Sequence, residues 1–198
     1  MPLYNSVTMN KIRYVLILLC IGIIASCHHR GSDVQDIAKP TPSQEKLLEN
    51  GWIVETPPED LSEEYGIHPI HGIQDNYFDI AIGEGCNVAV KIMDLRTDKC
   101  IRYVYVAENS TTTVQEIPQG IYYLKLAYGY DWMSYEINGK KTGKFTRNVS
   151  YERSQDTFDF GEKNSMQERN YSLEINVTNS KLENNFLTVQ IDEEEFLK

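Results

Sequence analysis

The chain has 198 residues, of which 41% are hydrophobic, 24% are charged and 11% are aromatic. Its 19 basic and 29 acidic residues give a formal net charge of −10 at pH 7, which disfavours binding to nucleic acid and to other polyanions. The length suits one domain plus a tail, and such a domain is large enough to bury a core without disulfides or metals.

The first 26 residues have the pattern of an export signal. Lys11 and Arg13 precede an apolar run of 11 residues from Tyr14 to Ile24, and the small residues Ala25 and Ser26 follow. The run is well short of the roughly 20 residues that a membrane-spanning helix needs, so we expect a cleaved signal and not a permanent span. Both Met1 and Met9 are candidate starts, because Met9 lies just before the charged pair.

The four residues Ile24-Ala25-Ser26-Cys27 resemble the lipobox of bacterial lipoproteins. The resemblance implies cleavage before Cys27 by signal peptidase II and acylation of that cysteine, and two or three acyl chains hold a protein on a membrane effectively permanently. His28 and His29 occupy positions where lipoproteins retained in the inner membrane often have Asp, which favours an outer-membrane anchor facing the periplasm. The alternative is an ordinary secretory signal that leaves Cys27 as a free thiol.

Residues 27–50 are expected to form the lipidated cysteine and a flexible polar linker, with a short helix that starts at Ser43 and ends near Gly51. Residues 51–76 give mixed signals and are expected to form an irregular lead-in. Loss of residues 1–26 removes two of the 19 basic residues and none of the 29 acidic ones, so the mature chain has a net charge of −12.

From residue 77 to 198, apolar residues alternate with polar ones at the period of two that is typical of half-buried strands. We predict eight strands: around Phe78–Ile82, at 87–94, 101–107, 112–117 and 121–128, around Phe158–Phe160, and at 171–177 and 187–191. Short strands separated by turn signals, with no long helical period, predict an all-β fold of two antiparallel sheets packed as a sandwich.

The segments Val88–Asp94, Ile101–Val106 and Ile117–Leu126 look similar to the prealbumin-like sandwiches of carboxypeptidase regulatory-type domains. The most recognisable element is Gly-x-Tyr-x-Leu, which begins at Gly120. The likeness covers about fifty residues and implies a prealbumin-like or immunoglobulin-like sandwich, but it implies no activity.

Cys86 and Cys100 are predicted to be unpaired. In the hairpin expected from residues 87–107, Cys100 faces Asp94, and Cys86 lies about 26 Å away along the first strand at about 3.3 Å per residue. A disulfide requires Cα atoms within about 7 Å, so the hairpin keeps the two thiols apart.

Residues 129–155 interrupt the regular spacing with a long insertion, and insertions of this length in compact domains are often functional or contain elements of their own. Asn138-Gly139 suits a type I′ hairpin turn. The insertion is rich in aromatic and basic residues, and the candidate binding surface consists of Tyr128, Tyr130, Trp132, Tyr135, Lys140, Lys141, Lys144 and Arg147, with Arg153 beyond them.

These residues allow two interpretations. In the first they form a binding surface, where rings stack on sugars or on partner side chains and bases attract acidic groups. In the second the rings cap one end of the sandwich and the bases balance acidic neighbours.

No motif for catalysis or for a cofactor is present, and we predict neither. His68 and His71, with Glu63 or Glu64 as a further ligand, provide too few candidate ligands to predict a metal site. The leading hypothesis is a non-enzymatic lipoprotein of the outer membrane that acts through a protein partner of the cell envelope. A carbohydrate-binding or adhesive module is the alternative, and an envelope hydrolase is the third possibility.

Overall fold

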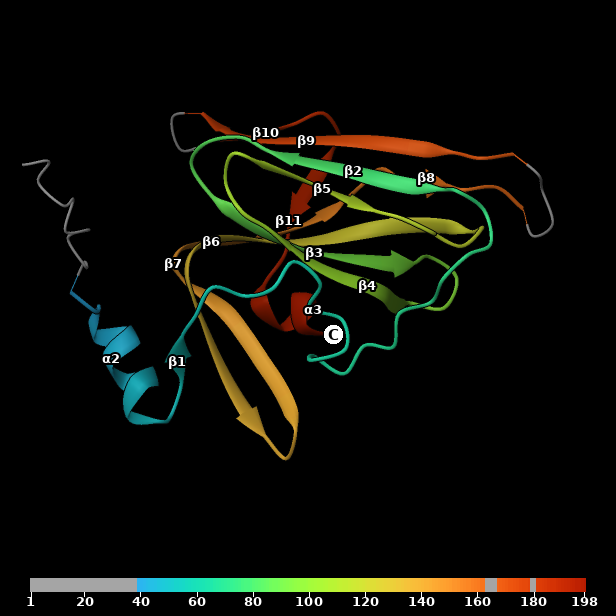
Figure 1. Ribbon diagram of the computed structural model, residues 1–198. Coiled ribbons are helices and arrows are strands. Elements are labelled where there is room, and N and C mark those ends of the chain that lie inside the picture. The colour runs from blue at the N-terminus through green and yellow to red at the C-terminus, as the bar shows by residue number, and fades with distance from the viewer. Residues whose placement is uncertain (1–38, 163–166, 179–180) are drawn as a thin grey trace, which may run out of the picture. The chain divides into compact units, whose positions relative to one another are not determined.

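A computed structural model describes residues 39–162, 167–178 and 181–198. The predicted signal peptide and Cys27 lie outside these residues. Residues 40–198 form one compact unit, in which two β-sheets pack face to face (Figure 1). The predicted all-β sandwich is therefore confirmed.

Within the described residues, the larger sheet has seven strands and the smaller sheet has four. The larger sheet has the order β11-β7-β6-β3-β4, and β1 and β8 also pair with β6. Its strands are β1 (Ile53–Val54), β3 (Asn87–Asp94), β4 (Lys99–Val106), β6 (Ile121–Ile137), β7 (Lys140–Ser154), β8 (Phe158–Asp159) and β11 (Thr188–Gln190). The smaller sheet has the order β10-β9-β2-β5, with β2 (Tyr77–Ile82), β5 (Ser110–Val114), β9 (Asn170–Thr178) and β10 (Lys181–Asn184). Two short helices, α2 (Pro42–Glu49) and α3 (Glu193–Leu197), complete the described unit.

One pair of strands departs from the predicted antiparallel arrangement. Strands β2 and β9 run parallel, with Phe78 opposite Tyr171 and Ile82 opposite Ile175. A parallel pair needs a long crossover, and here the chain passes through the larger sheet between the two strands. The smaller sheet is therefore mixed.

The main core lies between the two sheets. Alternate residues of β2 and β3 point into it, so Phe78, Ile80, Val88 and Val90 are fully buried. The ring of Phe78 packs edge-on against the ring of Phe158, with 5.2 Å between ring centroids. The period of two in the sequence arises because alternate residues of each strand point into this core.

A second core covers the other face of the larger sheet. It contains Leu61, Tyr103, Trp132, Phe145 and Phe196, which come from the lead-in, from three strands and from α3. Because both faces are covered, six successive residues of β3 are buried. The alternation in the sequence predicts polar partners on this face and gives no sign of the second core.

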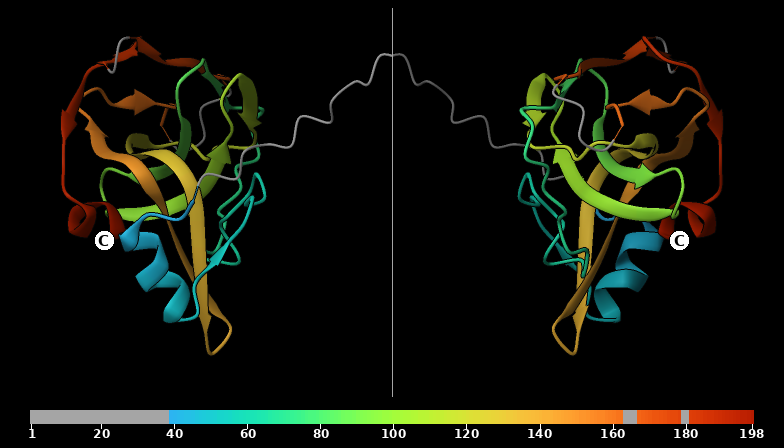
Figure 2. Two further views of the ribbon diagram at one scale, coloured as in Figure 1. Left: turned by 90° about the vertical axis from the view of Figure 1, so that its left-hand side faces the viewer. Right: turned by 90° about the vertical axis from the view of Figure 1, so that its right-hand side faces the viewer.

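The expected insertion at 129–155 is a continuation of two sheet strands. Strand β6 extends to Ile137 and β7 begins at Lys140, and positive φ angles of 53° at Asn138 and 75° at Gly139 fit the predicted type I′ turn. The predicted turn at Asn138-Gly139 is confirmed, and the residues on either side of it form a β-hairpin and not a loop. We call β1 and residues 130–147 the arm, which extends beyond the sandwich with α2 beside it (Figure 2).

The expected linker also ends earlier than residue 50. Helix α2 begins with a capping box, in which the Thr41 hydroxyl accepts a hydrogen bond from the Gln44 backbone N–H and the Gln44 side chain accepts one from the Thr41 backbone N–H. The helix belongs to the compact unit. The predicted helix is thus confirmed, but it is docked and is not part of a free linker.

Both cysteines of the sandwich are free thiols, Cys86 buried and Cys100 partly buried. Cys100 pairs with Met93, one residue from the expected partner, because the register shifts between Ile92 and Met93. Burial raises the pKa of each thiol to about 11, so both are protonated at neutral pH.

Gly129 marks the bulge where the sandwich part of β6 passes into the arm. Its φ is +155°, and a Cβ there would lie 2.7 Å from the Cβ of Phe145. Gly139 has a φ of +75°, but a Cβ there would meet nothing within 4 Å.

We expect Gly129→Ala to lower the free energy of unfolding by about 1–3 kcal/mol more than Gly139→Ala, because the new Cβ at residue 129 adds steric overlap with Phe145 to the backbone strain. Denaturant titration of both variants measures this difference, and equal losses would contradict the bulge geometry.

Candidate functional site

Two of the four candidate rings lie inside the protein. Tyr128 is 2% exposed, and its hydroxyl donates to Glu152 Oε2 at 3.3 Å. Trp132 is 3% exposed, and its Nε1 donates to the hydroxyl of Tyr65 at 3.2 Å. Neither ring has a free face for a sugar or a partner, so both positions fit the interpretation in which rings cap the sandwich.

The other two candidate rings are partly exposed. The Tyr130 hydroxyl donates to Glu108 Oε2 at 3.3 Å, and the Arg147 guanidinium lies 4.5 Å from the centre of the Tyr130 ring. Tyr135, near the end of the arm, stacks on Trp52 with 6.0 Å between ring centroids. Tyr130 and Tyr135 are therefore the two candidate rings that retain accessible surface.

Most of the candidate bases have acidic partners. Lys141 Nζ lies 2.8 Å from Glu55 Oε1 and 3.0 Å from Glu64 Oε2. Burial favours the neutral amine of Lys141, but the hydrogen bonds to both carboxylates outweigh it and raise its pKa. Lys144 pairs with Glu193 at 2.9 Å.

Arg147 and Asp131 also form part of the contact that docks α2 on the arm. Arg147 Nε lies 2.7 Å from Asp131 Oδ2. Gln44 of α2 is 6% exposed, and its side-chain amide donates to Asp131 Oδ2 at 3.1 Å and to Thr146 Oγ1 at 2.9 Å. Arg147 therefore has a structural role, because it holds the Asp131 carboxylate that α2 also contacts.

Lys140 differs from the other three bases. It is exposed at the start of β7 and takes part in no ion pair among the described residues. It lines a hollow of about 430 Å³ at the end of the arm, together with Tyr135, Ile137 and Lys141.

The arm also exposes apolar residues that sequence reasoning did not assign to a site. Ile53 is 56% exposed, Val54 is 62% exposed and Ile137 is 54% exposed. Ile53 lies opposite Ser134 of β6, so β1 forms an edge of the arm. For Ile53 and Val54 the signal in the sequence was the apolar run Trp52-Ile53-Val54, which is equally typical of a buried strand.

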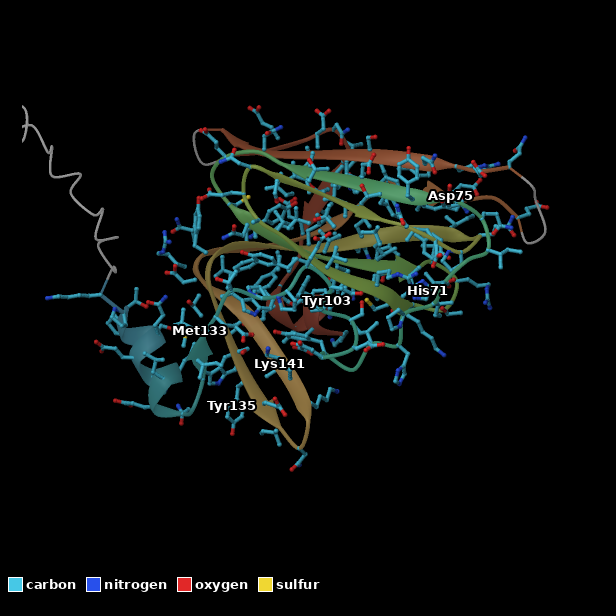
Figure 3. All side chains as sticks on the ribbon, viewed as in Figure 1. His71, Asp75, Tyr103, Met133, Tyr135 and Lys141 are labelled. Carbon is cyan, nitrogen blue, oxygen red and sulfur yellow. The ribbon has the colours of Figure 1, made fainter. Side chains whose placement is uncertain are left out.

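His71 lies among charged side chains of the described residues. No group of three or more His, Cys, Asp or Glu side chains suited to a metal ion occurs in the part of the chain that the structure describes. His71 Nδ1 lies 2.8 Å from Glu116 Oε2 and 3.0 Å from Arg102 Nη2, while Glu64 pairs with Lys141 on the arm (Figure 3).

Comparisons with protein-family models, with curated proteins and with solved structures found no match to this chain. Within residues 39–162, 167–178 and 181–198, no helix has the length and apolar character needed to cross a membrane. The site must therefore be interpreted from its own geometry.

Replacement of Trp132 tests its structural role. We expect Trp132→Ala to lower the free energy of unfolding by about 3–5 kcal/mol, because a large ring leaves the second core. Tyr130→Ala serves as the control and should cost under about 1 kcal/mol, since it loses mainly an exposed cation–π contact. Chemical denaturation measures both, and an unchanged stability of Trp132→Ala would restore the binding interpretation of this residue.

The contact between Asp131 and α2 should depend on pH. Hydrogen bonds from Arg147 hold the pKa of Asp131 below its usual value of 3.8, and Gln44 adds to the effect. A lowered pKa in the folded state stabilises the protein fully above about pH 5, and this stabilisation is lost as the pH falls through the lowered pKa.

We therefore expect Asp131→Asn to cost up to about 1 kcal/mol at pH 7 and much less near pH 3, since the pair is partly exposed. Glu84→Gln, at an exposed acid in a turn, is the control and should show no such trend. Denaturant titration at both pH values measures the cost, and a cost that grows on acidification would refute the assigned pair.

Proposed function

We propose that this protein is a lipid-anchored, non-enzymatic interaction module of a bacterial cell envelope. Cys27 attaches it to the outer membrane, and the end of the arm contacts a protein partner. The single observation that carries this proposal is the set of exposed β-branched side chains on a structurally supported arm, with Ile53 and Val54 on its edge strand β1 and Ile137 at its end.

The arm is suited to protein contact because its base is fixed and its end is exposed. Trp132 and Phe145 anchor it in the second core, and α2 packs along it through Gln44. A preorganised surface loses little conformational entropy on binding, which favours affinity. Exposed Ile and Val on a sheet edge favour association with another chain.

The charge around the arm indicates the character of the partner surface. Lys140 projects beside Ile137 without an acidic partner in the described residues. The protein as a whole is acidic, with a net charge of −10. We therefore propose a partner with an apolar surface and an acidic group close to it.

Carbohydrate binding is supported less well. It requires accessible ring faces, whereas Tyr128 and Trp132 are buried and Tyr135 already stacks on Trp52. Tyr130 and Tyr135 alone keep accessible surface for a sugar.

Photo-crosslinking tests the contact site. A photoreactive phenylalanine analogue at Ile137 of the full chain, in the cells that make the protein, should give one discrete adduct with an envelope protein. The same analogue at Leu187, which is 64% exposed, is the control and should give none. Val54→Asp in the Ile137 background should abolish the adduct, because a charge disrupts an apolar contact. Adducts from both positions, or from neither, would contradict the proposed surface.

Replacement of the predicted lipidated residue tests the anchor. We expect Cys27→Ser to remove labelling by fed palmitate, since the acyl chains are attached to this cysteine. Cys20→Ser is the matched control and should keep the label. Palmitate labelling of Cys27→Ser would refute the lipid anchor.

A further inference from the structure

A second hollow lies between the arm and the end of α3. We call it the lysine pocket; its volume is about 410 Å³, and its lining includes Tyr65, Ile67, Lys91, Tyr103, Lys140 and Lys198. In Figure 3, Lys141, which also lines it, lies on the arm between Tyr103 of β4 and Tyr135. The pocket is thus formed by elements that are far apart in the sequence.

The floor of this pocket contains a buried positive charge. Lys91 is 8% exposed, and its Nζ donates to the Phe196 carbonyl at 2.8 Å and lies 3.5 Å from the Leu197 carbonyl. Lys125 lies directly opposite Lys91 in the β3–β6 pairing, is 3% exposed and donates to the Glu195 carbonyl at 2.8 Å. Two adjacent buried ammonium groups therefore contact the last turn of one short helix.

These two charges are not balanced by protein carboxylates. None of the ion pairs among the described residues includes Lys91 or Lys125. The end of a helix supplies roughly half of one negative charge, which is too little for two ammonium groups. Desolvation, partly offset by Cys100 and reinforced by Lys125, lowers the pKa of Lys91, as expected for an uncompensated buried amine.

The rest of the lining adds to the positive charge. Four lysines, Lys91, Lys140, Lys141 and Lys198, face the pocket, and no Asp or Glu among the described residues lines it. Lys141 and Lys198 have acidic partners elsewhere, but Lys140 has none in the described ion pairs. The Lys91 ammonium also lies 4.8 Å from the centre of the Phe196 ring and 5.4 Å from that of the Tyr103 ring. These rings and the two backbone carbonyls carry no full negative charge, so an anion in the pocket would supply the one that Lys91 lacks.

The walls of the pocket are aromatic and apolar. Tyr65 packs edge-on against Tyr103, with 5.5 Å between ring centroids, and its hydroxyl accepts a hydrogen bond from Trp132. Gly143 permits this arrangement, because a Cβ there would lie 2.5 Å from the Tyr65 hydroxyl oxygen. The volume falls in the range of about 300–1,000 Å³ that is common for small-molecule sites and is larger than one inorganic anion needs.

We propose that the lysine pocket binds a small organic oxyanion, in which a phosphate or carboxylate group sits between Lys91 and Lys140 and an apolar or aromatic part packs against Tyr65 and Ile67. Such a ligand supplies the negative charge that the buried lysines lack. Lys140 and Lys141 line both this pocket and the hollow at the end of the arm, but binding of a small oxyanion does not require the proposed protein partner.

Isothermal titration calorimetry on the purified full chain in detergent tests the proposal. The probes are phenyl phosphate, benzoate, inorganic phosphate and neutral benzyl alcohol. We expect saturable binding of one phenyl phosphate or one benzoate per chain, weaker binding of inorganic phosphate and no saturable binding of benzyl alcohol. The comparison of phenyl phosphate with benzoate decides which anionic group is preferred.

Two variants and a control locate the site. Lys91→Met and Lys140→Gln should each weaken binding of the preferred probe at least about tenfold, because each removes a charge-assisted hydrogen bond. Lys140 is exposed, so Lys140→Gln keeps the test valid if Lys91→Met does not fold. Lys99→Gln makes the same charge change at the exposed first residue of β4 and should have no effect. Absence of saturable binding, equal binding by Lys140→Gln and the unaltered chain, or equal binding of benzyl alcohol would overturn the proposal.

Discussion

The larger sheet buries side chains on both of its faces, and the aromatic layer on its outer face holds the arm, the lead-in and α3 to the sandwich. Tyr103 and Trp132 come from the sheet itself, whereas Leu61, Tyr65 and Phe196 come from segments that cross it. A sandwich with one inter-sheet core would leave the extension of β6 and β7 as a solvated two-stranded hairpin, which is at best marginally stable in water. Packing of Trp132 against Phe145 and Tyr65 gives the arm a core of its own. The two proposed binding features, the exposed apolar residues of the arm and the lysine pocket between the arm and α3, both depend on this packing.

The basic residues of the arm and of the sheet beside α3 have two different roles, which their positions in the sequence do not distinguish. Lys141, Lys144 and Arg147 pair with carboxylates of the lead-in, of α3 and of the arm itself, so they join segments. Lys91 and Lys125 lie on strands, between hydrophobic neighbours, and contact the end of α3 in place of a carboxylate. An acidic protein that keeps two unbalanced buried lysines beside a hollow has a physical reason to bind an anion there. Lys140 and Lys141 line both this hollow and the one at the end of the arm, so Lys140 is common to the two proposals, which differ in the size of the ligand.

The sequence predicts the sandwich well where only one face of a strand is buried. Phe78, Ile80 and Ile82 alternate with half-buried residues, and this period identified β2 and its burial. The Asn138-Gly139 turn was also predictable, because few dipeptides adopt two successive positive φ angles. The arm was mistaken for a loop because residues 132–134 are buried in succession, which removes the alternation. The second core was missed because Leu61, Trp132 and Phe196 are distant in sequence, and the lysine pocket was missed because a Lys within a strand is usually on the solvent face. The parallel pairing of β2 with β9 has no local signal at all.

Hydrogen–deuterium exchange of the full chain tests the central structural claim most directly. If the second core fixes the arm to the sandwich, the backbone amides of residues 132–134 should exchange as slowly as those of residues 88–92 in the centre of β3, because both segments are buried within the same sheet. Rapid exchange at 132–134, at the rate of the exposed turn at Glu84–Gly85, would show that the arm opens independently and would contradict the account.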